Sequence, residues 1–119
     1  MRTVARELGA TYALNEVVLD TLVLQKGKLQ RRILSVPEHE HPVGGQLMGS
    51  RPETFGLAAR EMVRAGYDIV DINFGCPVNK VLGRHRGGWL LQDVETALAM
   101  VEAVLQAVQG DAPVSVKMR

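Results

Sequence analysis

The sequence has a single cysteine, few aromatic residues and almost no excess of charge of either sign. One cysteine excludes a disulfide within the chain and a zinc site made of cysteines alone, and it fits a reducing compartment, so we expect a cytoplasmic protein. Aromatic residues are 4% of the 119, too few for a base-stacking surface built from many rings. The formal net charge is +1, so composition alone does not indicate a polyanionic partner.

Long apolar runs are also missing. No stretch approaches the ~20 apolar residues of a membrane span, and the first residues carry charge where a signal peptide would be apolar. We therefore expect a soluble protein with no membrane partner. Hydrophobic residues make up 46% and charged residues 23% of the chain, which is ordinary for one globular domain.

Glycine and proline residues divide the chain into segments with the periodicities of helices and strands. The patterns predict helices over Arg2–Leu8, from Ser50 to Gly66 and from Asp93 to Gly110, and strands over Tyr12–Val18, Val43–Gly49, Ile69–Asn73 and Val114–Met118. Residues 22–34 fit either a helix or a hairpin, and residues 38–42 fit a loop.

The helix after Ser50 has the clearest start signal. Ser50 is a residue of the N-cap type, Pro52 suits the first turn, and Glu53 stands at the spacing of a capping box. Asp93 is expected to cap the later helix in a similar way. Apolar residues then recur at helical spacing in both segments, which predicts that each helix packs one face against a sheet.

Strands that alternate with helices, with connections long enough for crossovers, predict an α/β fold with a parallel sheet. In two strands one face turns polar toward the carboxyl end, with Asp71 and Asn73 in the first and Ser115 and Lys117 in the second. An open sheet with helices on both sides would need two apolar faces. A (β/α)8 barrel gathers polar site residues at the carboxyl ends of its strands, so we expect part of such a barrel.

The most informative run is Asp71-Ile-Asn-Phe-Gly-Cys-Pro-Val-Asn-Lys-Val81, followed by Gly87-Gly-Trp-Leu-Leu91. It places Cys76 in a turn bounded by Gly75 and Pro77, directly after a strand. A lone cysteine is more often a small buried apolar residue than a functional one. The position at a strand end, beside glycine and proline, favours the functional interpretation.

This run resembles the signature of the tRNA-dihydrouridine synthases, flavoenzymes with a (β/α)8 barrel, in which Asn-x-Gly-Cys-Pro-x-x-Lys-Val is followed by a glycine pair and Leu-Leu. The similarity extends to residues 45–49, 55–66 and 114–119, and more weakly to residues 2–18. It implies reduction of uridine to 5,6-dihydrouridine in tRNA. The hydride would come from FMN reduced by NADPH and add to C6, and the proton would come from Cys76 and add to C5. An ordinary thiol is mostly protonated at neutral pH and can act as this acid.

The resemblance also implies roles at other strand ends. Gln46 and Lys117 match family positions that contact the flavin, and Asn73 matches a residue near the flavin and the base. Each alone could be structural: a strand amide, a snorkelling lysine and a turn former. Their joint placement at the carboxyl ends of successive strands favours a cofactor site.

The loop after Cys76 carries Lys80, Arg84 and Arg86, which are candidate contacts to tRNA phosphates. A solvated loop without a partner is an equal alternative. His39 and His41 lie in a loop flanked by proline with no third ligand in sight, so we expect no metal site.

The length conflicts with a whole barrel, which needs about 250 residues. By its patterns the chain corresponds roughly to strands two to five, so residues 1–119 are expected to be a partial catalytic domain that lacks the N-terminal strand and the C-terminal half. Met1 would then be an internal methionine of a longer reading frame. We expect an unpaired sheet edge at residues 12–18 and another at residues 114–118. We also expect weak or no FMN binding by the chain alone.

Alternative functions remain for this sequence. One is another FMN-dependent barrel reductase of the dihydroorotate dehydrogenase type, against which the Lys80-Val81 and Gly87-Gly88 continuation counts. The other is an inactive truncated fragment. The short length favours a fragment, whereas the intact set of Gln46, Asn73, Cys76 and Lys117 argues against it.

Overall fold

Helices and strands follow the alternating order that the sequence predicts. A computed structural model describes residues 1–119. Its helices are α1 (Arg2–Glu7), α2 (Asp20–Leu24), α3 (Lys28–Ile33), α4 (Pro52–Arg64), α5 (Asn79–Leu82) and α6 (Val94–Val108), with 3-10 helices η1 (Glu38–Glu40) and η2 (Gly87–Gln92). Its strands are β1 (Ala13–Leu14), β2 (Val18–Leu19), β3 (Val43–Met48), β4 (Ile69–Phe74) and β5 (Val114–Met118). None of the helices has the length and hydrophobicity that crossing a membrane takes.

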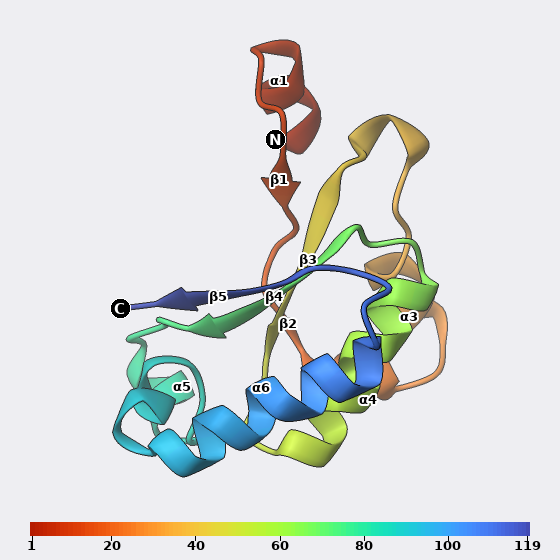
Figure 1. Ribbon diagram of the computed structural model, residues 1–119. Helices are drawn as coiled ribbons and strands as arrows, with labels where there is room; N and C mark the ends of the chain where they lie inside the picture. Colours follow the sequence, from red (N-terminus) through yellow and green to blue (C-terminus); the bar gives the residue numbers. More distant parts are fainter.

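All strand pairs of the sheet are parallel, which confirms the expected α/β class. The strand order is β1-β3-β4-β5, with β2 paired to the end of β3. The strands β3 and β4 therefore lie inside the sheet, whereas β1 and β2 form one edge and β5 forms the other (Figure 1). These are the segments that were expected to form unpaired edges.

The first edge is not the single strand predicted over Tyr12–Val18. It consists of β1 and β2, which pair with opposite ends of β3. Between them the side-chain oxygen of Asn15 accepts a hydrogen bond from the backbone N–H of Gln46 at 2.7 Å. A side chain thus takes the place of a backbone acceptor at this point, and the ladder of strand hydrogen bonds is interrupted.

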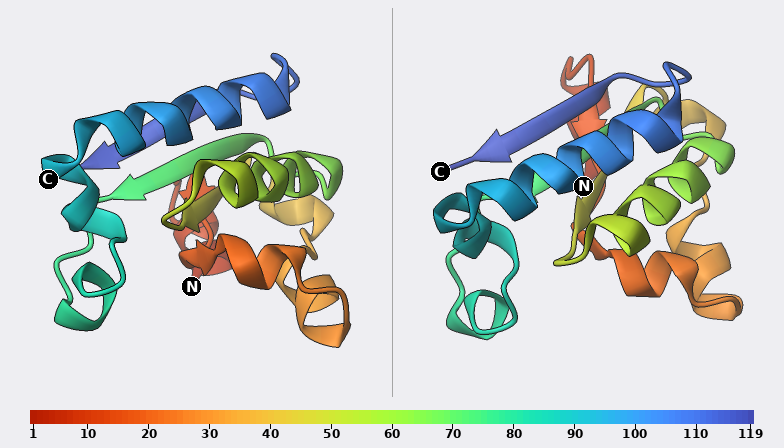
Figure 2. Two further views of the ribbon diagram at one scale, coloured as in Figure 1. Left: turned by 90° about the horizontal axis from the view of Figure 1, so that it is seen from below. Right: turned by 60° about the horizontal axis from the view of Figure 1, so that its bottom comes forward.

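Helices cover one face of the sheet, with α4 and α6 side by side and α2 next to α4 (Figure 1 and Figure 2). The interface buries Ile72 of β4, Phe55 of α4 and Val104 of α6 almost completely. Gly56 lets α4 and α6 approach closely, since a Cβ at this position would lie 2.8 Å from the backbone oxygen of Ala103. Helices on one face of a parallel sheet are the arrangement of a (β/α)8 barrel segment, so the expected fold class is confirmed.

The two predicted helix caps have different outcomes. Asp93 caps α6 as expected, because its Oδ1 accepts a hydrogen bond from the backbone N–H of Thr96 at 3.2 Å. The capping box at Ser50 is wrong: α4 begins at Pro52, and its N-cap is Arg51, without a side-chain cap. A proline disfavours the helical conformation in the residue before it, and Arg51 is extended, so the helix cannot begin one residue earlier.

Segments that the sequence left open or predicted as loops contain short helices. Residues 22–34 are helical instead of a hairpin, with α2 and α3 separated at Gly27, where φ is 149°. The loop predicted over residues 38–42 contains η1, and the long glycine-rich loop after β4 contains α5 and η2. These elements span few residues each, so they lack the repeated apolar spacing from which a helix is recognised.

Asp68 joins the loop before β3 to the start of β4. Its Oδ2 accepts hydrogen bonds from the backbone N–H of Val43 at 2.7 Å and from Nδ1 of His41 at 2.8 Å. Burial on its own raises the pKa of Asp68. The hydrogen bonds from Val43 and His41, together with the charge of His41, outweigh that effect, so the pKa lies below its ordinary value of 3.8.

We therefore expect Asp68 to stabilise the fold in a pH-dependent way. A carboxyl group with a depressed pKa in the folded state contributes fully above its unfolded pKa and loses that contribution as the pH falls through the folded pKa. The free energy of unfolding of Asp68→Asn should lie below that of the wild type at about pH 6 and converge with it below about pH 3. Urea denaturation over this range measures the gap, with Glu102→Gln as a surface control, since Glu102 is exposed and belongs to none of the ion pairs. A gap that does not change with pH would contradict the role of the Asp68 charge.

Candidate active site

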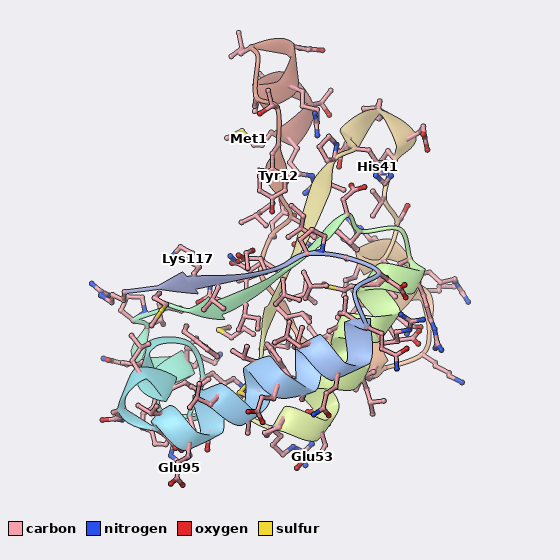
Figure 3. All side chains as sticks on the ribbon, in the orientation of Figure 1. Met1, Tyr12, His41, Glu53, Glu95 and Lys117 are labelled. Carbon is pink, nitrogen blue, oxygen red and sulfur yellow. The ribbon has the colours of Figure 1, made fainter.

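Polar side chains gather on the open face of the sheet toward the carboxyl ends of β3, β4 and β5. Gln46 of β3 lies opposite Asp71 of β4, and Asn73 of β4 lies opposite Lys117 of β5. Asp71 also lies opposite Ser115 of β5. Figure 3 shows Lys117 on the side of β5 that faces away from α6. The parallel register thus brings three predicted site residues, Gln46, Asn73 and Lys117, to one face.

A continuous chain of hydrogen bonds links these strands. Asn73 Nδ2 donates to Gln46 Oε1 at 3.0 Å, and Gln46 Nε2 donates to Asp71 Oδ2 at 2.7 Å. Ser115 Oγ donates to the other carboxylate oxygen of Asp71 at 2.6 Å. Only 9% of Gln46, 5% of Asp71 and 7% of Asn73 is exposed. Because buried polar atoms are costly to leave unpaired, these bonds hold the side chains in one arrangement.

Asn73 also holds the turn that carries Cys76. Its Oδ1 accepts hydrogen bonds from the backbone N–H groups of Gly75 and Cys76, both at 3.1 Å. On the other side, the Cys76 carbonyl accepts a hydrogen bond from the N–H of Gly88 at 3.0 Å. Gly87 has a φ of 58°, and a Cβ there would lie 2.9 Å from the Cys76 Cβ. The turn is therefore held from both sides, and its free thiol belongs to a half-buried residue.

Lys117 reaches the same turn from β5. A Cβ at Gly75 would lie 3.1 Å from Lys117 Nζ, so the ammonium group lies over the glycine that precedes Cys76. Lys117 is exposed on the edge strand, and none of the ion pairs of the chain includes it. Its charge is therefore available to a ligand beside Cys76.

The open face offers hydrogen-bond donors to a ligand. An amide nitrogen carries a pair of N–H groups, and Gln46 and Asn73 each use one of them inside the network. With the ammonium group of Lys117, the remaining N–H groups form a set of donors. A flavin ring presents carbonyl oxygens and, when reduced, negative charge. The donor set therefore fits FMN, the cofactor that the resemblance implies.

The predicted RNA-binding residues differ in their surroundings. Lys80 in α5 and Arg84 just after it are exposed. Arg86 is half-buried, and its Nε is buried without a hydrogen-bond partner. The ring of His85, which stands between Arg84 and Arg86 in the chain, stacks on Trp89, with ring centroids 4.1 Å apart and an angle of 18° between the planes. Lys80 and Arg84 are thus free to meet a polyanion, whereas Arg86 is partly packed against the loop.

The two histidines of the loop before β3, His39 and His41, differ in their surroundings. His39 is exposed in η1, and His41 Nδ1 is bound to Asp68. No group of three or more His, Cys, Asp or Glu side chains is placed to hold a metal ion.

Sequence reasoning missed part of the polar network. Asp71 and Ser115 were recognised on the polar strand faces but received no role, although both complete the hydrogen-bond chain that starts at Asn73. Asn15 was not singled out, and it binds the backbone of Gln46 and the hydroxyl of Tyr67. The polar alternation of the strands was a signal for Asp71 and Ser115, whereas nothing near Asn15 in the sequence indicates its contacts.

A parallel sheet that is covered on one face defines a segment of a (β/α)8 barrel, and its polar groups and cysteine turn lie at the carboxyl ends of the strands, where such barrels carry their sites. The chain belongs to the dihydrouridine synthase family, whose family model matches residues 1–119. The family resemblance of the Cys76 run is thereby confirmed.

Curated relatives agree with this family. The chain is 34% identical to tRNA-dihydrouridine synthase B of Pseudomonas aeruginosa over 99% of its own length and 35% of the relative. It is 36% identical to a probable tRNA-dihydrouridine synthase of Rhizobium leguminosarum, again over 99% of the chain and 36% of the relative. A probable tRNA-dihydrouridine synthase 1 of Synechocystis is 40% identical over 74% of the chain and 24% of the relative. The chain spans about a third of the length of the curated relatives it matches.

Proposed function

We propose that this chain is the part of a (β/α)8 barrel that carries the proton donor and part of the flavin site of a tRNA-dihydrouridine synthase. The reaction is the reduction of uridine in tRNA to 5,6-dihydrouridine, in the cytoplasm. The observation that carries the proposal is the position of Cys76 on a turn held by Asn73, beside the donors of Gln46 and Lys117. Family membership supports the same reaction class.

Gln46, Asn73 and Lys117 would hold the FMN ring. The unused amide N–H groups suit its carbonyl oxygens, and the ammonium group of Lys117 suits the negative charge of the reduced ring. Bound FMN, once reduced by NADPH, would supply the hydride that adds to C6 of the uracil.

Cys76 would supply the proton. Its Sγ–H would be donated to C5 of the base as C6 becomes saturated, which requires the thiol to be held at a fixed place. The hydrogen bonds to its backbone N–H and carbonyl provide that restraint. A thiol on a turn anchored at both sides needs little reorganisation in the reaction.

Exposed cations near this turn would meet the tRNA. Lys80 and Arg84 follow Cys76 closely in the chain and are exposed, so they can contact phosphates around the target uridine. Arg86 would contribute through the part of its guanidinium group that remains accessible. The small net charge of the chain is consistent with further tRNA contacts elsewhere in the protein.

An apolar groove supports the proposal that residues outside this chain complete the barrel. It has a volume of about 250 Å³ and lies between α6 and β5, where its lining includes Leu98 of the helix and Val116 and Met118 of the strand. Met118 is 65% exposed and Val116 39% exposed. In a (β/α)8 barrel the next helix packs on this side of the sheet and would cover such side chains.

The test is NADPH-dependent formation of dihydrouridine in an unmodified tRNA transcript, measured by mass spectrometry of the digested RNA. The 119-residue chain is compared with the chain extended by its flanking coding sequence, both supplied with FMN. We expect product with the extended protein, and little product or flavin absorbance near 450 nm (a rough value) with the chain alone. Orotate reduction without dihydrouridine formation would contradict the proposal and favour a reductase of the dihydroorotate dehydrogenase type.

A further inference from the structure

Asp71 is a buried carboxylate that the proposed chemistry does not use. It lies in the middle of the sheet, on β4, with 5% of its surface exposed. Both of its oxygens accept hydrogen bonds, one from Gln46 and the other from Ser115. A carboxylate with donors on both oxygens acts as the acceptor at which a chain of hydrogen bonds ends.

The direction of this chain is fixed at its other end by the Cys76 turn. The backbone N–H groups of Gly75 and Cys76 can only donate, so the oxygen of the Asn73 amide must face them. The Asn73 nitrogen then faces Gln46 and requires an acceptor, which makes Oε1 the atom that Gln46 presents to it. The Gln46 nitrogen is thereby turned toward Asp71.

We propose that Asp71, held by Ser115, is a positioning residue that fixes, together with Asn73, the orientation of the Gln46 amide. With an acceptor at Asp71, Gln46 satisfies Asn73 and Asp71 at once and keeps one N–H for the ligand. A hydrogen-bond donor at position 71 would instead favour the flipped orientation of the Gln46 amide. The Gln46 nitrogen would then face the nitrogen of Asn73. The inference rests on the proposed function only in assigning FMN as the ligand that accepts a hydrogen bond from the remaining N–H of Gln46.

The negative charge of Asp71 also affects Tyr12, which lies just before β1 at the first edge of the sheet. Burial and, after it, the negative charge of Asp71 raise the pKa of the Tyr12 hydroxyl. The Tyr12 hydroxyl lies over the open face at the start of β3, where a Cβ at Gly44 would meet it. Gly44 and Gln46 share that face, so the charge of Asp71 acts on the side of the sheet that carries the site.

An exchange of donor and acceptor tests the orientation. In Gln46→Glu the new carboxylate faces Asp71, and we expect the folding equilibrium constant at pH 7 to fall at least about tenfold. In Asp71→Asn the oxygen of the new amide can accept a hydrogen bond from Gln46, and the Ser115 hydroxyl can turn to accept one from the new amide nitrogen. The folding equilibrium constant should therefore stay within about threefold of the wild type. In Asp71→Asn with Gln46→Glu the new amide donates to the new carboxylate, and the constant should return to within about threefold of the wild type.

Urea unfolding of the 119-residue chain measures these constants. Asp111→Asn with Gln46→Glu is the matched control, because Asp111 is exposed and pairs with Arg60, outside the network. This double variant should show no recovery. If Gln46→Glu alone does not fold, recovery of a folded circular dichroism spectrum on adding Asp71→Asn is the supporting result. Effects of the paired substitutions that simply add, or equal recovery with Asp111→Asn, would overturn the positioning role.

Fluorescence titration with FMN separates this inference from the proposed function. The titration uses the extended protein, which we expect to bind FMN. Its doubly substituted form lacks the Gln46 N–H, so we expect its FMN affinity to stay at least about tenfold below that of the extended wild type although the fold has recovered. Folding recovery without FMN binding by any variant, including the extended wild type, would support the positioning role and count against the flavin function. FMN binding by the extended wild type without folding recovery in the double variant would support the flavin function and count against the positioning role.

Discussion

The substitution Cys76→Ala should lower the rate of dihydrouridine formation by about 10²- to 10⁴-fold and leave FMN binding unchanged. The thiol is the only cysteine of the chain, and no other acidic group shares its turn between Gly75 and Pro77. Under the proposed function, C5 of the uracil then has no positioned proton donor. Alanine keeps the backbone N–H and carbonyl that bind Asn73 and Gly88, so the turn itself should persist.

The measurement uses the extended protein, unmodified tRNA and NADPH, with bound flavin determined from the absorbance of the purified variant. Cys76→Ser is the matched control for size, and it should also be slow because a hydroxyl is a far weaker acid than a thiol. Turnover equal to the wild type in Cys76→Ala would refute the role as proton donor. Loss of bound flavin together with activity would instead indicate a structural role.

The long-range features of the fold could be predicted because their signals extend over many residues. The stripe of apolar residues in α4 and α6 and the alternation in β4 and β5 are repeated patterns, and they determine which faces meet the core. The order of strands and helices then leaves few arrangements of a parallel sheet. The division of the first edge at Asn15 could not be predicted, because it depends on a contact with Gln46, which is distant in sequence.

The candidate site divides in the same way. Cys76 and Asn73 stand in one short run, so their joint position at the end of β4 could be predicted from the chain alone. Gln46 and Lys117 join them only through the register of neighbouring strands. The expected roles of Gln46 and Lys117 therefore came from the resemblance to a family, and the contact of Gln46 with Asp71 was not foreseen.

Asn73 connects the Cys76 turn to the polar network, and this explains why its type matters. One side-chain oxygen serves the N–H groups of Gly75 and Cys76, and the nitrogen serves Gln46. An amide is the only common side chain of this length that accepts at one end and donates at the other. The position of the thiol and the orientation of the Gln46 amide are therefore coupled through a single residue.

Asn73→Ala should be strongly destabilising, with a loss of about 3 kcal/mol in the free energy of unfolding. It leaves the backbone N–H groups of Gly75 and Cys76 and the oxygen of Gln46 without their partner, and Asn73 is 7% exposed, so little water can replace it. Asn79→Ala, at an exposed position of the same loop, is the control and should change stability by less than about 0.5 kcal/mol.

The same variant should loosen the Cys76 turn, which the rate of alkylation of the only thiol reports. Asn73→Asp separates the two functions of the amide, because a carboxylate keeps the acceptor for the turn but cannot donate to Gln46. We expect alkylation of Cys76 to rise in Asn73→Ala and to stay close to the wild-type rate in Asn73→Asp, whereas both lose stability in urea. Equal stability and equal alkylation in Asn73→Ala and Asn79→Ala would show that Asn73 does not hold the turn.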